Sequence, residues 1–427
     1  MNATIIRAAA PFVALALALP AGAGAPLPPD PLDLAWCVER ALEANPEIAI
    51  DAASAEAARA RILPAGALDD PRFGYDAVNL PVGRWDFDST PMSGNQLGIR
   101  QRLPFPGLLG HRERAARAAA DAAGSVLEDR RLRIRSRARA LWAELGYAQR
   151  ALAITRRNIA LVRQLARIAE ARYAVGRGLQ QDVIRAQVEL TRLLDQEIAR
   201  RAAVERAGAA LVSLLDLPPD QVLPETAPLP DESPVPALEG LYEGLETRHP
   251  RLRALAARVE EADRLRRVAE LEGYPDFDLG IGYRIRSRVP GDPAPGDDFL
   301  SAGVTIRLPV NRAKWRERVA EREAQLRRAR AEFHRTRLEI EEAIRARHAD
   351  LRRADEAARL LRDGLVPQAR QSLESNRAGY EVDRVDFLSL IDAWVRLFDA
   401  ELRLERTWAD RHRAFAALEA AVGEPLR

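Results

Sequence analysis

The chain has 427 residues, of which 47% are hydrophobic and 30% are charged, and its formal net charge is +2. This composition excludes an intrinsically disordered chain and a polytopic helical membrane protein, and it offers no basic excess for binding nucleic acid. The single cysteine, Cys37, excludes an intramolecular disulfide and a thiolate metal cluster within one chain.

The N-terminal segment is typical of an export signal. Arg7 precedes the apolar run AAAPFVALALALP, and the small residues AGAGA follow it. The run is too short to span a bilayer as a helix, so we expect a cleaved signal peptide over residues 1–25; the alternative is a buried N-terminal helix. Trp36 precedes Cys37 far beyond the apolar run, which argues against a lipoprotein signal. An exported chain without disulfides indicates the periplasm or the outer membrane.

A duplication organises the rest of the chain. Pro46 in ANPEI corresponds to Pro250 in RHPRL, and Asp182 in QQDVIRAQ corresponds to Asp386 in RVDFLSLI, each pair being 204 residues apart. Between the two copies, residues 217–236 contain seven prolines, which is the composition of a linker. We therefore expect two structural repeats, 26–216 and 237–427, joined by the linker 217–236.

The first repeat predicts a helix, a strand pair over 71–103 and a long helical hairpin over 107–215. No proline occurs between Pro106 and Pro218. Apolar or small residues recur there with the spacing of a coiled-coil seam. They are Leu127, Ile134, Ala138, Leu141, Leu145, Ala148, Leu152, Ile159, Val162, Ala166, Ala169 and Tyr173. A continuous helix over 107–174 would be roughly 100 Å long. The two glycines of AVGRGLQ (174–180) then predict a reversal, and 181–215 return.

The second repeat follows the same plan, with a helix, a strand pair over 275–309 and a hairpin over 311–423. Its first long helix is predicted over 311–377, with a turn at 377–386 and a returning helix to about Gly423. Pro367 should cause only a local kink. The seam contains Ile340, Ile344, Leu351, Ala358, Leu361 and Leu365.

The strand pairs alternate between apolar and polar residues. Phe277, Leu279, Ile281, Tyr283 and Ile285 alternate with polar residues or glycine, and a polar loop rich in glycine and proline follows them. We expect strands near 71–79, 95–103, 276–286 and 299–308. Segments of about ten residues have the length of a tilted transmembrane β-strand. The alternative is an ordinary antiparallel sheet with one solvated face.

Four strands are too few to close a membrane barrel. Single-chain barrels begin at eight strands, and an open edge in lipid would leave backbone groups unsatisfied. The chain is therefore expected to oligomerise, and three copies would supply twelve strands.

These features together resemble the TolC-type outer-membrane efflux proteins, over essentially the whole mature chain. The shared features are the export signal, the duplication, the strand pairs, the long hairpins and LPFPG at the strand-to-helix junction. Within that family, QRLPFPG and RVDFLSLIDA most resemble the heavy-metal efflux branch, of the CzcC and CusC type. Leu108 stands where that branch usually has lysine.

The resemblance implies a fold class that is mainly α with transmembrane β. A homotrimer would form a 12-stranded β-barrel in outer-membrane lipid and an α-helical barrel across the periplasm. Its implied partners are a periplasmic adaptor (a membrane fusion protein) and an inner-membrane resistance-nodulation-division pump. The implied function is a passive export duct for heavy-metal cations; organic compounds such as drugs are the alternative cargo, and protein secretion is a third.

The two hairpin turns, 174–182 and 378–392, lie one long helix away from the strands. They should form the periplasmic end, where an adaptor and a pump would dock. Candidate docking residues are Gly176, Gly178, Gly379 and Tyr380, and candidate gate residues are Asp182, Asp386 and Asp392. The resemblance implies rings of acidic residues at a closed entrance; Asp392 matches one such position, whereas Ser389 stands at another. For Asp182 and Asp386, capping of a helix N-terminus is an equal alternative.

Nothing in the sequence indicates an enzyme. Gly-x-Ser-x-Gly, a phosphate-binding glycine loop and HExxH are all absent from the sequence, and no two of its five histidines are spaced i,i+4. We expect no catalytic residue, no cofactor and no metal site. Long helices with heptad spacing would also suit a secreted coiled-coil scaffold or a cytosolic coiled coil that binds nucleic acid. The strand pairs disfavour the scaffold, and the export signal disfavours the cytosolic protein.

Overall fold

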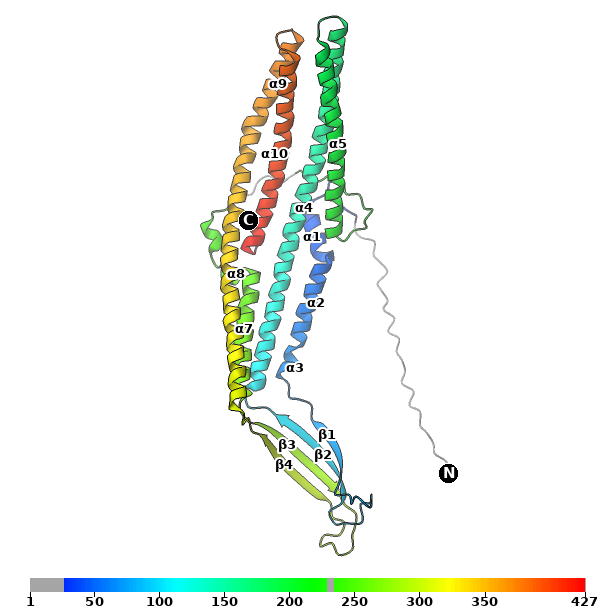
Figure 1. Cartoon of the computed structure of the whole chain (residues 1–427), viewed down its shortest axis with the longest axis vertical. Helices are drawn as coiled ribbons and strands as arrows, with labels where there is room; N and C mark the ends of the chain where they lie inside the picture. Colours follow the sequence, from blue (N-terminus) through cyan, green and yellow to red (C-terminus); the bar gives the residue numbers. More distant parts are fainter. Residues whose placement is uncertain (1–26, 229–233, 427) are drawn as a thin grey trace, which may run out of the picture.

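The computed structural model describes residues 27–228 and 234–426. The predicted signal peptide, 1–25, lies outside the described residues, as does the part of the linker at 229–233. The molecule is elongated, with the β-sheet at one end and the turns of both helical hairpins at the other (Figure 1).

The first repeat begins with three short helices that pack against the strand-proximal part and the middle of a much longer helix. The short helices are α1 (Leu34–Ala44), α2 (Pro46–Ala60) and α3 (Ile62–Gly66). Strands β1 (Arg72–Val78) and β2 (Gly94–Leu103) follow, and then the hairpin of α4 (Leu108–Ala174) and α5 (Gln180–Leu214).

The second repeat follows the same plan of short helices, a strand pair and a long helical hairpin. A 3-10 turn (Glu239–Tyr242), α6 (Leu245–Arg248) and α7 (Pro250–Leu271) precede strands β3 (Asp276–Ile285) and β4 (Phe299–Arg307). The second hairpin consists of α8 (Arg312–Leu360), a π-helical turn (Leu361–Leu365), α9 (Val366–Glu381) and α10 (Phe387–Val422).

The duplication is visible in the way equivalent helices begin. The side chain of Asn45 accepts a hydrogen bond from the backbone N–H of Glu47 at the start of α2. Nδ1 of His249, 204 positions later, accepts one from the backbone N–H of Arg251 at the start of α7. In both repeats a proline follows the capping residue, where its missing N–H costs nothing.

The four strands form one antiparallel sheet in the order β1-β2-β3-β4. Because side chains alternate between the faces of a strand, the register places two different surfaces back to back. One face carries large apolar side chains, among them Phe73, Leu97, Ile99, Leu279, Ile281, Tyr283, Leu300, Val304 and Ile306, and most of them are exposed. The other face carries glycine and polar or charged residues.

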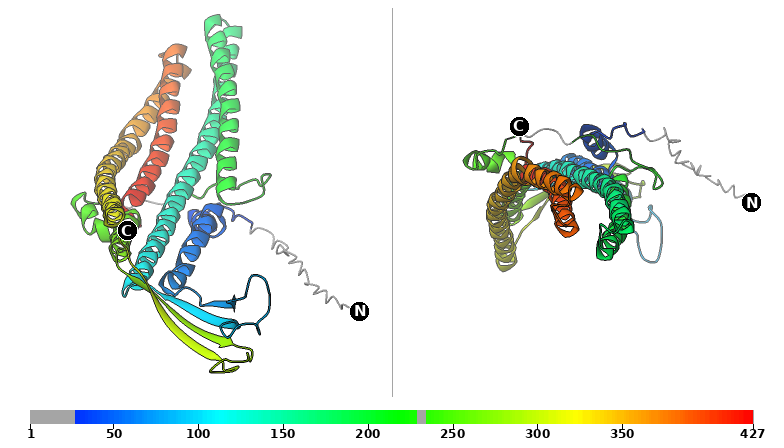
Figure 2. Two further views of the ribbon diagram at one scale, coloured as in Figure 1. Left: turned by 60° about the horizontal axis from the view of Figure 1, so that its bottom comes forward. Right: turned by 90° about the horizontal axis from the view of Figure 1, so that it is seen from above.

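Helix α4 is a single helix of 67 residues at the centre of the helical region. It packs against α5, α7 and α10. Most of the predicted seam is buried in it: Ile134, Ala138, Leu145, Ala148, Ile159, Val162, Ala166 and Ala169. Seen end-on, the long helices lie along an arc (Figure 2). The fold class predicted from the sequence, long helical hairpins plus four strands, is thus confirmed.

The second hairpin differs from the prediction in two places. Instead of a simple kink at Pro367, the helix passes through the π-helical turn Leu361–Leu365, because proline at 367 has no N–H to donate into the preceding turn. The turn also begins later than residue 377, since α9 continues to Glu381. None of the helices in the described ranges combines the length and apolar character required of a membrane-crossing helix.

Candidate functional site

The first hairpin turn reverses the chain at Gly176. This glycine has a φ of +73°, a left-handed conformation that glycine adopts without steric cost. Gly178 serves differently: a Cβ atom there would lie 3.0 Å from the backbone nitrogen of Tyr173, so its role is close packing. Asp182 lies in the first turn of α5, where a carboxylate is favoured by the helix dipole, and it is half-buried.

The second hairpin turn reverses at Asp383, not at Gly379. Asp383 has a φ of +61°, whereas Gly379 and Tyr380 lie in the last turn of α9. Gly379 is needed for space, because a Cβ atom would lie 2.5 Å from Cγ2 of Val385. Gly379 therefore allows close packing in the last turn of α9, and the positive φ of the reversal belongs to Asp383.

Arg172 at the end of α4 joins the two turns. It donates a hydrogen bond to the backbone carbonyl of Tyr380, pairs with Asp383, and places its guanidinium carbon 4.5 Å from the centroid of the Tyr380 ring. Burial raises the pKa of Tyr380; the Arg172 charge opposes that rise, and the nearby Asp182 carboxylate adds to it. The docking candidates Gly176, Gly178, Gly379 and Tyr380 and the gate candidate Asp182 thus lie at one end of the molecule, where Arg172 connects the end of α4 to Tyr380 and Asp383.

The other two gate candidates have local partners. The side chain of Asp386 accepts a hydrogen bond of 2.8 Å from the backbone N–H of Ser389 and caps α10, and hydrogen bonds from Ser389 lower the pKa of its carboxyl. Asp392 pairs with Arg396 on the same helix at 2.9 Å, and both side chains are more than half exposed. Within one chain, therefore, Asp386 performs the capping role and Asp392 presents its carboxylate at the surface.

An apolar cluster below the turns binds the two hairpins together. It includes Val162, Leu165, Leu193, Phe387, Leu390 and Trp394, drawn from α4, α5 and α10. Inside it, Nε1 of Trp394 donates a hydrogen bond to Oδ1 of Asn158 at 2.7 Å. The tips of the two repeats are thus packed as one unit.

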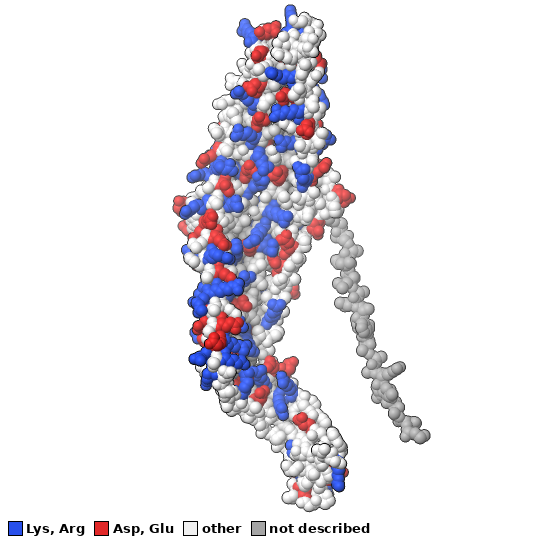
Figure 3. All heavy atoms as spheres, viewed as in Figure 1, with Lys and Arg blue, Asp and Glu red and all other residues white. Residues whose placement is uncertain are grey.

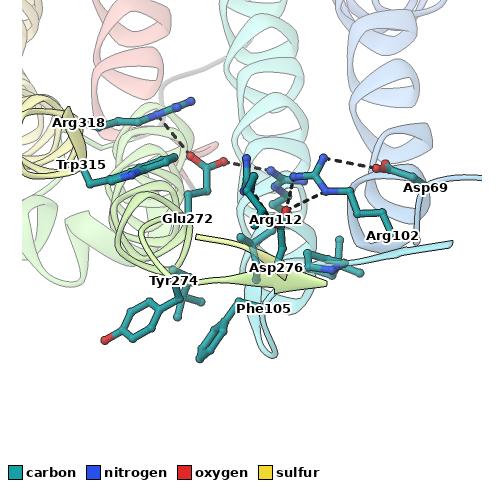
Figure 4. Close-up of a pocket in the computed structure, with 14 residues that line it drawn as sticks. Asp69, Arg102, Phe105, Arg112, Glu272, Tyr274, Asp276, Trp315 and Arg318 are labelled. Atoms are coloured by element: carbon teal, nitrogen blue, oxygen red, sulfur yellow. Dashed lines mark hydrogen bonds and ion pairs between the residues drawn. The ribbon is translucent and has the colours of Figure 1, made fainter. Parts of the chain in front are cut away.

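The opposite end of the helices contains the junction with the strands (Figure 4). A cavity of about 120 Å³ lies there between the two repeats. Phe105 stacks on Tyr274 with ring centroids 4.6 Å apart. Glu272 pairs with Arg112 at 3.0 Å and with Arg318 at 3.3 Å.

The buried carboxylate of Asp276 ties three strands together at this junction. Its two oxygens accept hydrogen bonds of 2.6 Å from Arg102 of β2 and from Arg307 of β4. The segment LPFPG ends at this junction with Gly107. This residue precedes α4 with a φ of +90°, which a residue with a side chain adopts only with strain, so the position requires glycine. Ion pairs and stacked rings thus join the two repeats at this junction.

Several of these residues carry no signal in the sequence. Arg172 is one of very many arginines, and only the fold brings it beside Tyr380 and Asp383. Asn158 lies 236 residues from its partner Trp394. In the part of the chain that the structure describes, no three or more His, Cys, Asp or Glu side chains are placed to hold a metal ion together.

Comparison with known proteins connects this geometry to a family. A family model described as outer membrane efflux protein matches residues 37–216 and 241–424. Protein CyaE of Bordetella pertussis is 28% identical over 333 residues, which cover 76% of this chain and 68% of that protein.

Solved structures show the same fold at low sequence identity. The outer membrane protein VceC of Vibrio cholerae superposes with a TM-score of 0.76 at 18% identity, over 92% of this chain and 97% of that one. CusC superposes with a TM-score of 0.78 at 15% identity, over 92% of each chain.

Proposed function

We propose that this chain, which belongs to the outer membrane efflux protein family, is the channel subunit of a tripartite efflux system and acts as a passive export duct. The observation that carries the proposal is the four-stranded sheet, apolar on one face and polar on the other, at the end of two long helical hairpins. A membrane barrel needs that division between a lipid-facing and a lumen-facing surface.

The edges of the sheet support a trimer. Strands β1 and β4 stand at the two ends of the strand order, and their outer backbone groups would be unsatisfied in lipid. Three chains, each passing its β4 edge to the β1 edge of the next, would give the twelve-stranded barrel expected from the sequence. The arc of long helices is the shape that one third of a helical tube requires (Figure 2).

The distribution of charge supports the placement of the two ends. Lys and Arg are interspersed with Asp and Glu along the helical region, whereas the face of the sheet end seen in this view shows only a few of them (Figure 3). The sheet would lie in the outer membrane, with the helices in the periplasm. The turns at Gly176 and Asp383 would then be the end that meets a periplasmic adaptor and a resistance-nodulation-division pump.

Two cargo classes are candidates. The sequence resemblance favours heavy-metal cations, and the carboxylates of Asp182, Asp386 and Asp392 at the periplasmic end would attract cations. Organic compounds are the alternative, and they are favoured by a pair of arginines, Arg72 and Arg100, that lie opposite each other on the polar face of the sheet.

Deleting the gene tests the proposal as a whole. A channel of this kind should leave the deletion strain sensitised either to zinc, cobalt, cadmium, copper and silver or to dyes and antibiotics, and the pattern identifies the cargo. Unchanged tolerance to every compound, together with no conductance of the purified protein in planar bilayers, would contradict the channel assignment.

A further inference from the structure

The polar face of the sheet contains one row of paired residues, one from each strand, that carries a net positive charge. The register places Arg72 of β1 opposite Arg100 of β2, and Arg100 opposite Gly280 of β3, which in turn faces Gly303 of β4. We call these four residues the arginine row. It contains two positive charges and no carboxylate.

The paired rows on either side of it carry no net positive charge. Toward the hairpin loops, the next row consists of Gly74, Gly98, Gly282 and Ser301 and is uncharged. Toward the helices, Arg102 lies opposite Asp278 and shares the carboxylate of Asp276 with Arg307, and Asp70 lines the same hollow, so this side carries charges of both signs. The arginine row is therefore a local maximum of positive charge along the strands.

Both arginines are exposed, and neither makes an ion pair within the described residues. Two like charges directly opposite each other on one face of an antiparallel pair destabilise it. The neighbouring guanidiniums of Arg102 and Arg307 avoid such repulsion because they share the carboxylate of Asp276. Among the described residues, Asp70 and Asp278 line the same hollow but neither pairs with Arg72 or Arg100, so an external anion would relieve the repulsion between the two arginines.

The glycines leave space for such an anion. Cγ of Arg100 lies 3.5 Å from where a Cβ atom on Gly280 would stand, so the arginine side chain extends over that glycine. No atom lies within 4 Å of the Cβ position on Gly303 or on Gly74. The surface over Gly74 and Gly303 is therefore open.

We propose that the arginine row binds oxyanions, the phosphate or carboxylate groups of exported solutes, inside the barrel. The proposal rests on the proposed channel function, which makes the polar face the lumen. In a trimer, two arginines from each of three chains place six guanidiniums at one height. Guanidinium offers paired N–H donors that match the oxygens of phosphate and carboxylate.

The positive charge of the arginine row should affect the two cargo classes differently. A ring of fixed positive charge in a pore raises the barrier for free cations and lowers it for anions. It therefore favours organic solutes that carry anionic groups over free metal cations.

Binding is tested without any need for an open channel. Trimer purified in detergent is heated in inorganic phosphate and in chloride at equal ionic strength. Wild-type protein should melt higher in phosphate, because a ligand that binds only the folded state stabilises it. The double variant Arg72→Gln/Arg100→Gln should lose most of that rise.

The control Arg84→Gln/Arg288→Gln removes two exposed loop arginines without ion pairs among the described residues, and it should keep the rise. Equal phosphate effects in all three proteins would overturn the proposal.

Selectivity is tested by reversal potentials in planar bilayers. The ratio of anion to cation permeability should fall by roughly twofold or more in Arg72→Gln/Arg100→Gln and stay unchanged in the loop control. A conducting wild-type channel with the same ratio in every variant overturns the arginine row and leaves the channel function intact. A phosphate effect that depends on Arg72 and Arg100, in a protein that never conducts, supports the anion site and overturns the channel.

Discussion

Nε1 of Trp394 donates a hydrogen bond to Oδ1 of Asn158 across the boundary between the two repeats, at 2.7 Å. Both side chains are buried, and Nδ2 of Asn158 donates in turn to the backbone carbonyl of Ile154. A buried polar pair of this kind fixes one arrangement of α4 against α10, because any sliding of the helices would leave polar atoms without partners.

We predict that Trp394→Phe lowers stability by about 1–3 kcal/mol, because it keeps an aromatic ring but leaves Oδ1 of Asn158 without its donor. Thermal or denaturant unfolding of the purified protein measures this. Trp85→Phe is the control, since Trp85 is 86% exposed. Equal destabilisation by the two variants would show that the hydrogen bond contributes nothing.

We predict opposite effects for two neighbouring glycines. Gly107→Ala should destabilise the junction by roughly 1–2 kcal/mol, because alanine is strained at a φ of +90°. Gly110→Ala, in the first turn of α4, should stabilise by up to about 1 kcal/mol, because its Cβ would touch only the end of Arg114 at 3.8 Å. If both variants shift the melting temperature in the same direction, the positive φ of Gly107 is not what makes glycine necessary in LPFPG.

We predict that stability falls as the pH drops from 6.5 to 4, in part through His412. Burial, together with the charges of Arg411, Arg150 and Arg139, lowers the pKa of His412 from 6.5 to about 4. Between these values the unfolded chain binds a proton at this residue and the folded chain does not, so the contribution is complete above pH 6.5 and is lost toward pH 4. His412→Gln should flatten this part of the pH profile, whereas His334→Gln, at an exposed position, should not.

We predict that Asp392→Ala changes stability by only about 0.5 kcal/mol or less, because its ion pair with Arg396 is exposed. If Asp392 is a gate residue, the same variant raises single-channel conductance and weakens block by cations. Asp182→Ala serves as a comparison, since its main effect should be on helix stability or docking. Unaltered conductance and cation sensitivity in the Asp392 variant would make this residue structural.

The strands and long helices could be predicted because each repeats a simple period. Alternation at Phe277–Ile285 and the seam through α4 follow directly from residue spacing. The turn at Asp383 could not be predicted, because nothing in the sequence marks a non-glycine residue that adopts a positive φ. The nearby glycine, Gly379, is the residue type that usually adopts it. The arginine row depends on register, and only pairing of β1 with β2 puts Arg72 beside Arg100.

The strand order has a genetic consequence. Since each chain offers one free edge at β1 and another at β4, every subunit in a closed ring depends on both neighbours. A chain with prolines placed along β4 could still accept a neighbour at β1 but could not complete the circle. Co-expressed with the normal protein, such a chain should act as a dominant inhibitor, and one defective allele would disable most of the assemblies in the cell.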